Sequence, residues 1–194
     1  QYRSGDARTQ GWFGQGWSHP LATELWIDDD VLRYWDEQGR EVALPAVQVG
    51  QEHFEAYEQF TLLRPAANRW ALRHNQGVTH HFRQRHPLQR QLPLEVIQDR
   101  NRRRILLQFE DRDFADGFDP QAAPPRPHSL IDSAGRTLRL DWTERGQLAE
   151  VAFASSAARV VLARYGYGSS ATAAESQPDL LRHTDPNGQT RTYA

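Results

Sequence analysis

Residues 132–140, DSAGRTLRL, combine a turn with the strand that follows it. Two further stretches have the same form, DEQGREVAL at residues 36–44 and DPNGQTRTY at residues 185–193. Each unit begins with Asp, places Gly three residues later and Arg or Gln after the Gly, and ends on Leu or Tyr. Self-similar units along a chain indicate a repeat architecture. We therefore expect the repeated unit to determine the fold, as a wall or platform rather than a self-contained enzyme.

The residue types in the unit have a local structural explanation. An Asp at the start of a turn accepts hydrogen bonds from the backbone amides ahead of it, and a Gly three residues later adopts the left-handed conformation that reverses the chain. A fourth copy is predicted at residues 99–102 (DRNR), where Arg102 replaces the glycine and Asn101 is able to take the left-handed conformation. The predicted structural turn residues are Asp36, Gly39, Asp132, Gly135, Asp185 and Gly188.

Between the turns, apolar residues alternate with polar ones, as in half-buried strands. Leu138, Leu140 and Trp142 share one face of such a run, and residues 54–62 alternate in the same way. The sequence therefore predicts an all-β fold, an antiparallel ribbon of β-hairpins that forms part of a curved or spiralled shell. Its expected large buried anchors are Trp142, Phe153 and Tyr165.

Four regions follow from turn signals and composition. Residues 1–20 form a glycine and aromatic segment, in which the glycines let Trp12, Phe13 and Trp17 pack against the start of the sheet. Residues 21–115 form divergent hairpins, including a turn at the acidic triplet 28–30. Residues 116–129 form a proline-rich loop, and residues 130–194 form the clearest repeats, with a polar loop at 169–179.

Composition excludes several classes of protein. The 194 residues contain no cysteine, which excludes disulfides and thiolate metal sites. A formal net charge of −2 gives no electrostatic argument for nucleic acid or for an anionic membrane. No stretch is long and apolar enough to predict a membrane span.

The chemistry-bearing residue types do not converge on a predicted site. His80 and His81 suggest zinc, with His53, His74 and His86 near in sequence, but adjacent strand residues point to opposite faces. The acidic triplet lacks the pattern of a calcium loop, and the arginines at 102–104 follow a turn flanked by acidic residues. Ser18 and His19 are adjacent without an orienting carboxylate, and no nucleophile elbow or phosphate-binding glycine loop is present. We expect no catalytic, cofactor-binding or metal-ligating residues.

The repeated units resemble the YD repeats of bacterial Rhs proteins. The resemblance is clearest at residues 183–193 (HTDPNGQTRTY) and is supported by Tyr165-Gly166-Tyr167, while residues 14–20 (GQGWSHP) look like the region that precedes the repeats. This resemblance implies a structural segment of a hollow shell around a C-terminal toxin domain. Such toxins take part in interbacterial competition, and many are effectors of the type VI secretion system.

The resemblance also implies partners and a location. The partners would be the rest of the shell, the enclosed toxin domain, a VgrG tip with a PAAR-type spike domain, and a chaperone, with no nucleic acid among them. The protein would reside in the bacterial cytoplasm before export and then be secreted or delivered into target cells.

Two other functions stay open at this point. The first is a carbohydrate-binding β-repeat module for cell surfaces, in which exposed tryptophans stack on sugars: Trp26, Trp35, Trp70 and Trp142. The second is an enzyme, a hydrolase or a metal-dependent nuclease that uses His80 or His81.

Overall fold

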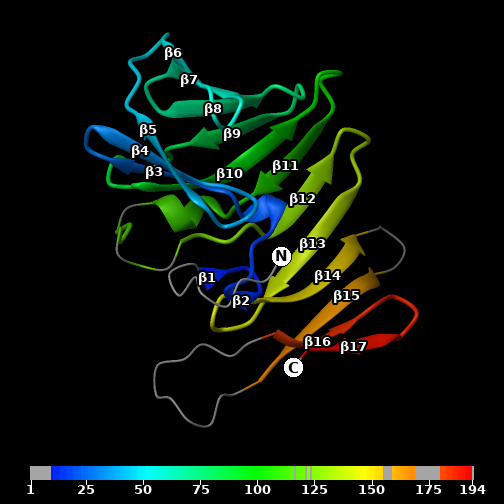
Figure 1. Ribbon diagram of the computed structural model, residues 1–194. Helices are drawn as coiled ribbons and strands as arrows, with labels where there is room; N and C mark the ends of the chain where they lie inside the picture. Colours follow the sequence, from blue (N-terminus) through cyan, green and yellow to red (C-terminus); the bar gives the residue numbers. More distant parts are fainter. Residues whose placement is uncertain are drawn as a thin grey trace.

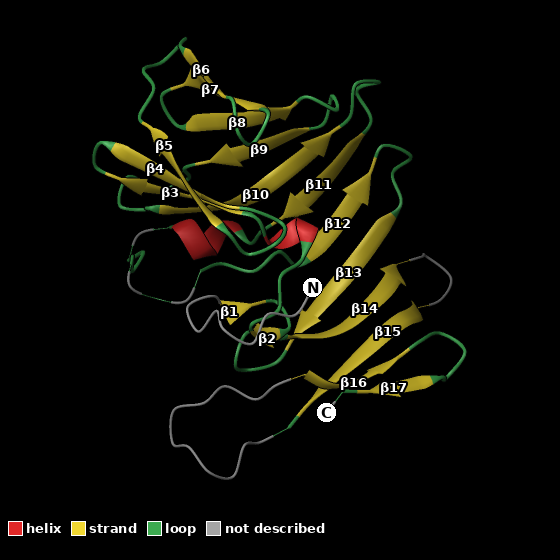
Figure 2. Ribbon diagram, viewed as in Figure 1, coloured by secondary structure: helices red, strands yellow, loops and turns green. Residues whose placement is uncertain are grey.

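The computed structural model describes residues 10–115, 117–120, 122, 124–154, 159–168 and 180–193. In these residues the fold is all-β: strands and their connecting turns make up nearly all of it, with two short 3-10 helices and no α-helix (Figure 2). The predicted fold class, an antiparallel hairpin sheet, is confirmed. The predicted loop at 169–179 lies outside the described residues.

The strands are β1 (Gln10–Gly11), β2 (Gly14–Gln15), β3 (Glu24–Asp28), β4 (Val31–Trp35), β5 (Glu41–Pro45), β6 (Glu52–Glu55), β7 (Phe60–Ala66), β8 (Arg69–His74), β9 (Thr79–Arg83), β10 (Gln91–Gln98), β11 (Arg104–Gln108), β12 (Ser129–Asp132), β13 (Thr137–Trp142), β14 (Leu148–Ala154), β15 (Arg159–Tyr167), β16 (Leu180–Thr184) and β17 (Thr190–Thr192). The 3-10 helices are η1 (Pro20–Ala22) and η2 (Asp111–Phe114). In the part of the chain that is described, no helix has the length and apolarity needed to cross a membrane.

Strands β3–β17 form one 15-stranded antiparallel sheet that is not closed into a barrel. From β6 to β17, each strand pairs with the next in the chain, so the sheet is a continuous ribbon of hairpins (Figure 1). Among the described residues, β5, β6 and β17 each have a neighbour on one side only. The ribbon therefore ends in open edges.

Strand β10 joins the ribbon to the hairpins that precede it. Its first residues, Gln91 to Pro93, pair with β3, whereas Leu94 to Gln98 pair with β9. The register shifts between Leu94 and Val96, and a bulge of this kind bends a strand and turns it from one sheet into another. Strands β3–β5 can therefore cover one face of β7–β9.

The face of the ribbon covered by β3–β5 is apolar, and we call it the inner face. Directly paired residues on antiparallel strands share a face. Pairing therefore places Leu72, His80 and Ile97 on this face at one end of the ribbon, and Leu138 and Phe153 further along. Its most buried side chains are Phe82, Leu25, Leu44, Leu62, Leu72, Leu92, Leu94 and Leu107.

The predicted anchors are less buried than these residues. Trp142 and Tyr165 are half-buried and pack against the core, and Phe153 is also half-buried. The strongest burial lies instead at β7–β10, where a second layer of strands covers the sheet. The expectation that these three aromatics are the fully buried anchors is therefore wrong.

The opposite, outer face of β13–β15 is charged. Arg159 contacts both Asp141 and Glu150, and Arg164 contacts Glu150 at 2.8 Å. Arg139 also contacts Asp141, at 3.2 Å. These arginines are exposed, so their ion pairs add little net stability. Their charges make this face of the sheet hydrophilic.

Residues 54–62 do not form the single strand that alternation predicts. Strand β6 ends at Glu55, residues 56–59 turn, and β7 begins at Phe60. Gln59 has a φ of 56°, so a non-glycine residue takes the left-handed conformation that closes this hairpin. The turn contains no Gly or Pro, which is why the sequence pattern conceals it.

The N-terminal aromatics pack against the C-terminal hairpins, not against the start of the sheet as expected. Trp12 lies edge-on to Trp142 with ring centroids 5.2 Å apart, and its carbonyl accepts a hydrogen bond from the Leu148 amide at 2.7 Å. Phe13 contacts Tyr165 at 4.9 Å, and Trp17 contacts Tyr193 at 5.4 Å. This segment therefore covers the inner face where β3–β5 do not reach.

Candidate functional site

The structure places the predicted turn residues in one shared geometry. In the first copy, Asp36 Oδ1 accepts hydrogen bonds from the amides of Gln38 (2.8 Å) and Arg40 (2.9 Å). Gly39 has a φ of +74° and donates its amide to the Asp36 carbonyl at 3.0 Å. The Asp36 amide in turn donates to the Arg40 carbonyl at 3.0 Å. One carboxylate thus organises the whole reversal.

The other copies repeat these hydrogen-bond distances to within 0.1 Å. The corresponding Oδ1 distances are 2.8 and 2.8 Å for Asp99, 2.9 and 2.9 Å for Asp132, and 2.9 and 2.8 Å for Asp185. Gly135 and Gly188 have φ values of +77° and +80°. In the copy that starts at Asp99, Arg102 itself is left-handed, with a φ of 62°, so Asn101 does not play the role expected of it.

A fifth turn of this form was missed from the sequence. Thr143 replaces the Asp, and its Oγ1 accepts the Gln147 amide at 3.1 Å. Gly146 follows three residues later with a φ of +74° and donates to the Thr143 carbonyl at 2.9 Å. The signal that could have identified it is a hydroxyl residue three positions before a glycine, since such a side chain is a weaker acceptor of the same kind.

We expect loss of the Asp36 carboxylate to destabilise the protein measurably. Its side chain is only 10% exposed and also pairs with Arg40, so Asp36→Ala removes charge-assisted bonds from a nearly buried turn. The expected loss is about 1–3 kcal/mol in the free energy of unfolding, measured by urea denaturation. Asp36→Asn keeps an acceptor oxygen for the amides and should lose less. Equal losses for both variants would contradict this account of the turn.

Removing the left-handed arginine from the turn at Arg102 should raise the free energy of unfolding, whereas Asp36→Ala should lower it. Left-handed backbone costs roughly 1–2 kcal/mol for a residue with a Cβ, and glycine avoids that cost but is more flexible when unfolded. Arg102→Gly is therefore expected to stabilise the fold by about 0.5–1 kcal/mol. Arg103→Gly, in the same turn but without a left-handed φ, is the matched control and should give no gain. Thermal denaturation measures both variants. A melting temperature raised by Arg102→Gly but not by Arg103→Gly would support the prediction, and equal changes would contradict it.

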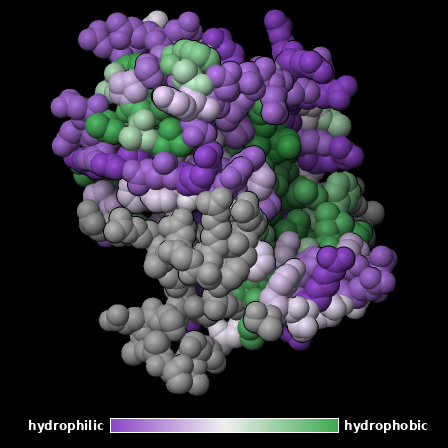
Figure 3. Space-filling view, in the orientation of Figure 1, coloured by the Kyte–Doolittle hydropathy of each residue, from purple (hydrophilic) through white to green (hydrophobic). Residues whose placement is uncertain are grey.

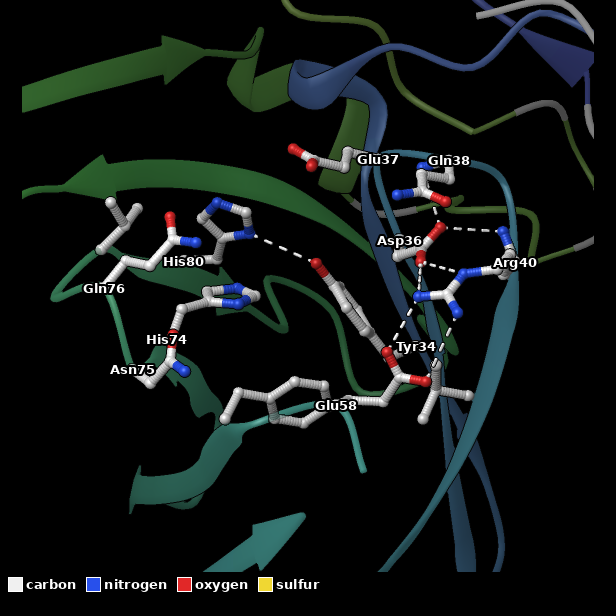
Figure 4. Close-up of a pocket in the computed structure, with 13 residues that line it drawn as sticks. Tyr34, Asp36, Glu37, Gln38, Arg40, Glu58, His74, Asn75, Gln76 and His80 are labelled. Atoms are coloured by element: carbon white, nitrogen blue, oxygen red, sulfur yellow. Dashed lines mark hydrogen bonds and ion pairs between the residues drawn. The ribbon is translucent and has the colours of Figure 1, made fainter. Parts of the chain in front are cut away.

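The first turn also forms one wall of an open pocket of about 270 Å³ (Figure 4). Strands β4, β5, β7, β8 and β9 contribute its lining, together with the turns that follow β4, β6 and β8. Arg40 connects the walls, since its guanidinium contacts Asp36 at 2.7 Å and Glu58 at 2.8 Å. The lining residues are Tyr34, Asp36, Glu37, Gln38, Arg40, Val42, Glu58, Phe60, His74, Asn75, Gln76, Val78 and His80.

Two histidines meet at the base of this pocket. His74 and His80 lie on the same face of β8 and β9, with ring centroids 4.8 Å apart. Tyr34 Oη lies 3.4 Å from His80 Nδ1, and Phe60 lies edge-on to both Tyr34 and His74. His74 Nε2 is buried and has no hydrogen-bond partner among the described residues. Tyr34 could not be predicted as their neighbour, because it belongs to β4, a strand far from β8 and β9 in the sequence.

Burial controls the protonation of these groups. It lowers the pKa of His80 to about 4, and the neighbouring His74 and His81 add to this effect. Burial also lowers the pKa of His74, against an opposing effect of Glu37. The pKa of Tyr34 is raised by burial and by the carboxylates nearby. At neutral pH all three side chains are therefore uncharged.

The remaining candidate residues lie apart from this pocket. His81 is on the outer face, opposite His80, while His53 lies on edge strand β6 and His86 contacts Phe118 at 4.8 Å. His19 stacks on Trp12 and accepts a hydrogen bond from the Leu21 amide. Within the described residues, no three or more His, Asp or Glu side chains are grouped to hold a metal ion.

The four tryptophans considered for sugar stacking do not share an exposed face. Trp70 is 3% exposed and lies under Arg64, whose guanidinium carbon is 4.9 Å from its ring centroid. Trp142 is half-buried, and its Nε1 donates to the Pro127 carbonyl at 2.8 Å. Trp35 is half-buried as well, and Trp26 is exposed.

The first 44 residues of the chain are similar to a known family. The model of the family described as "Domain of unknown function (DUF6531)" matches residues 1–44. Its described part runs from β1 to the fourth residue of β5. No curated protein matches the chain.

Proposed function

We propose that this chain is a structural segment of an Rhs-type β-hairpin shell, which helps to enclose a C-terminal toxin domain of the same longer protein. Delivery by type VI secretion in interbacterial competition, with a spike complex and a chaperone as partners, is part of this proposal. On this proposal the chain has no catalytic activity of its own, and any toxin activity lies in a domain outside it.

The observation that carries the proposal is a two-faced sheet that is not closed. The inner face of β11–β15 is apolar, yet it is incompletely covered: Ile105 is 38% exposed and Val160 is 49% exposed. Figure 3 shows apolar side chains gathered over β11–β14. The outer face of the same strands carries the ion pairs of Arg159 and Arg164. A sheet with one wet and one apolar face is the expected form of a wall that separates water from enclosed protein.

The repeated turn supports the same proposal. Each copy reverses the chain with its own Asp and a left-handed residue, so hairpins can be added without new long-range contacts. The open edge at β17 lets another strand pair with the ribbon. A sheet that is extended by hairpins with the same turn matches the architecture implied by the YD-repeat resemblance.

The two faces provide a matched test in the full-length parent protein. Val160 is on the inner face, because it pairs with Phe153, and Val161 is on the outer face, because it pairs with Ala152. Val160→Glu should place a charge against the enclosed domain, and Val161→Glu should place the same charge on the outer face, away from that domain. We expect Val160→Glu to make the C-terminal domain sensitive to added protease and to inhibit growth of the cells that produce the protein. Val161→Glu should have neither effect.

Removal of residues 132–193 is the stronger variant, and it should abolish containment. Unchanged protease protection and unchanged delivery after that removal would overturn the proposal. The sugar-binding alternative is not favoured, because Trp70 is buried and Trp142 is engaged by Pro127.

A further inference from the structure

Aromatic rings and imidazoles meet where β4 packs against the β7–β9 layer. Tyr34 is 2% exposed, and its ring meets Phe60 at 5.7 Å and Phe82 at 6.2 Å. Its hydroxyl meets His80, which is 7% exposed and lies against His74. The four residues Tyr34, Phe60, His74 and His80 form what we call the histidine seam. Figure 4 labels Tyr34, His74 and His80.

We propose that the histidine seam is an acid-sensitive joint, at which strands β3–β5 separate from β7–β9 when His74 and His80 take up protons. The geometry is unfavourable to charge in two ways. Two imidazolium rings 4.8 Å apart would repel each other. A proton on His74 Nε2 would also be buried without an acceptor, and burial of an unpaired charge is costly.

The charged groups around the seam do not neutralise such a pair. Glu58 and Asp36 are both ion-paired with Arg40. Their negative charges are therefore already compensated in part by the guanidinium. Glu37 is the carboxylate that acts on His74, and it is exposed. From the other face of β9, His81 adds further repulsion to His80. Asn75 and Gln76, which also line the pocket, are polar but uncharged. Phe60 on β7, Phe82 on β9 and the paired Ile97 on β10 are apolar.

The direction of the effect follows from linkage. The pKa of His80 in the folded state is about 4, below its ordinary value of 6.5, so the separated state binds a proton more tightly than the closed seam. Stability at the seam is therefore complete above about pH 6.5 and falls as the pH drops toward 4. For His80 alone, the ratio of open to closed seam should rise on the order of a hundredfold between about pH 7 and pH 4.

NMR titration of the whole chain tests the proposal directly. The ring signals of His74 and His80 are followed from about pH 7.5 to 4, together with the backbone amides of β4–β5 and, as an internal reference, those of β13–β14. We expect the amides of β4–β5 to change with the titration of the seam histidines, at a pH where β13–β14 is still intact.

The matched variants are His74→Asn with His80→Asn, which removes both titrating rings, and His53→Asn, which removes a ring on edge strand β6 outside the seam. The double variant should lose the acid response of β4–β5, and His53→Asn should retain it. If the double variant does not fold, the wild-type titration tests the proposal by itself, because it compares the amides of β4–β5 with those of β13–β14 in one protein. Histidine signals that titrate without any change in β4–β5, or simultaneous loss of β4–β5 and β13–β14, would overturn the proposal.

Discussion

Replacing Phe82 with alanine is expected to destabilise the protein by about 3–5 kcal/mol, because it empties a site where two layers of the sheet meet. Phe82 is 1% exposed and lies edge-on to Tyr34, and it is paired with both Trp70 and Leu94. Several strands would lose contacts at once, and the resulting cavity cannot collapse without moving β4. Urea denaturation with a two-state fit measures the change.

Phe54→Ala is the control for the Phe82 substitution. Phe54 lies on edge strand β6 and is 57% exposed, so its loss should cost well under about 1 kcal/mol. The chemical change is identical at the two positions, and only burial differs. Similar losses at Phe54 and Phe82 would show that the sheet at β7–β10 is not the centre of stability.

Replacing Trp12 with alanine is expected to cost about 3–5 kcal/mol, with a local signature that Phe82→Ala lacks. Trp12 is 4% exposed, is stacked on His19 and lies edge-on to Trp142. Its loss uncovers the inner face of β13–β15, far from the histidine seam. Hydrogen exchange should therefore increase first in β13–β17 and only later in β7–β10.

Trp26→Ala gives the corresponding control. Trp26 is 39% exposed, and its Nε1 donates to Glu24 on the same strand. We expect a small loss of stability and unchanged exchange in β13–β17. If Trp12→Ala left exchange in the C-terminal hairpins unchanged, the packing of the N-terminal segment against them would not matter for their stability.

Local features of the fold could be predicted from the sequence. An Asp that accepts its own turn amides, and a Gly that reverses the chain, act within five residues, so their pattern is visible in the sequence. The opposite faces of His80 and His81 likewise follow from strand geometry alone. The hairpin closed by Gln59 was missed, since a left-handed residue other than Gly or Asn leaves no signal.

Long-range features could not be predicted in this way. Nothing in the sequence of β10 shows that its first half pairs with β3 and its second half with β9, because the switch depends on a bulge between Leu94 and Val96. The meeting of Tyr34 with His80 depends on that same switch. The candidate site is therefore a product of tertiary packing, and sequence reasoning found its histidines but not their arrangement.

The position of the N-terminal segment has a consequence for how the protein folds. Trp12, Phe13 and Trp17 complete their packing on Trp142, Tyr165 and Tyr193, which the ribosome supplies much later than these three residues. The hairpins between them can form early, since each depends on its neighbour. The earlier segment must wait until the later hairpins have been synthesised, and closure of so long a loop carries an entropic cost that slows folding. Until that late step, the apolar side of β13–β15 is bare, and a growing chain with such a surface needs protection from aggregation.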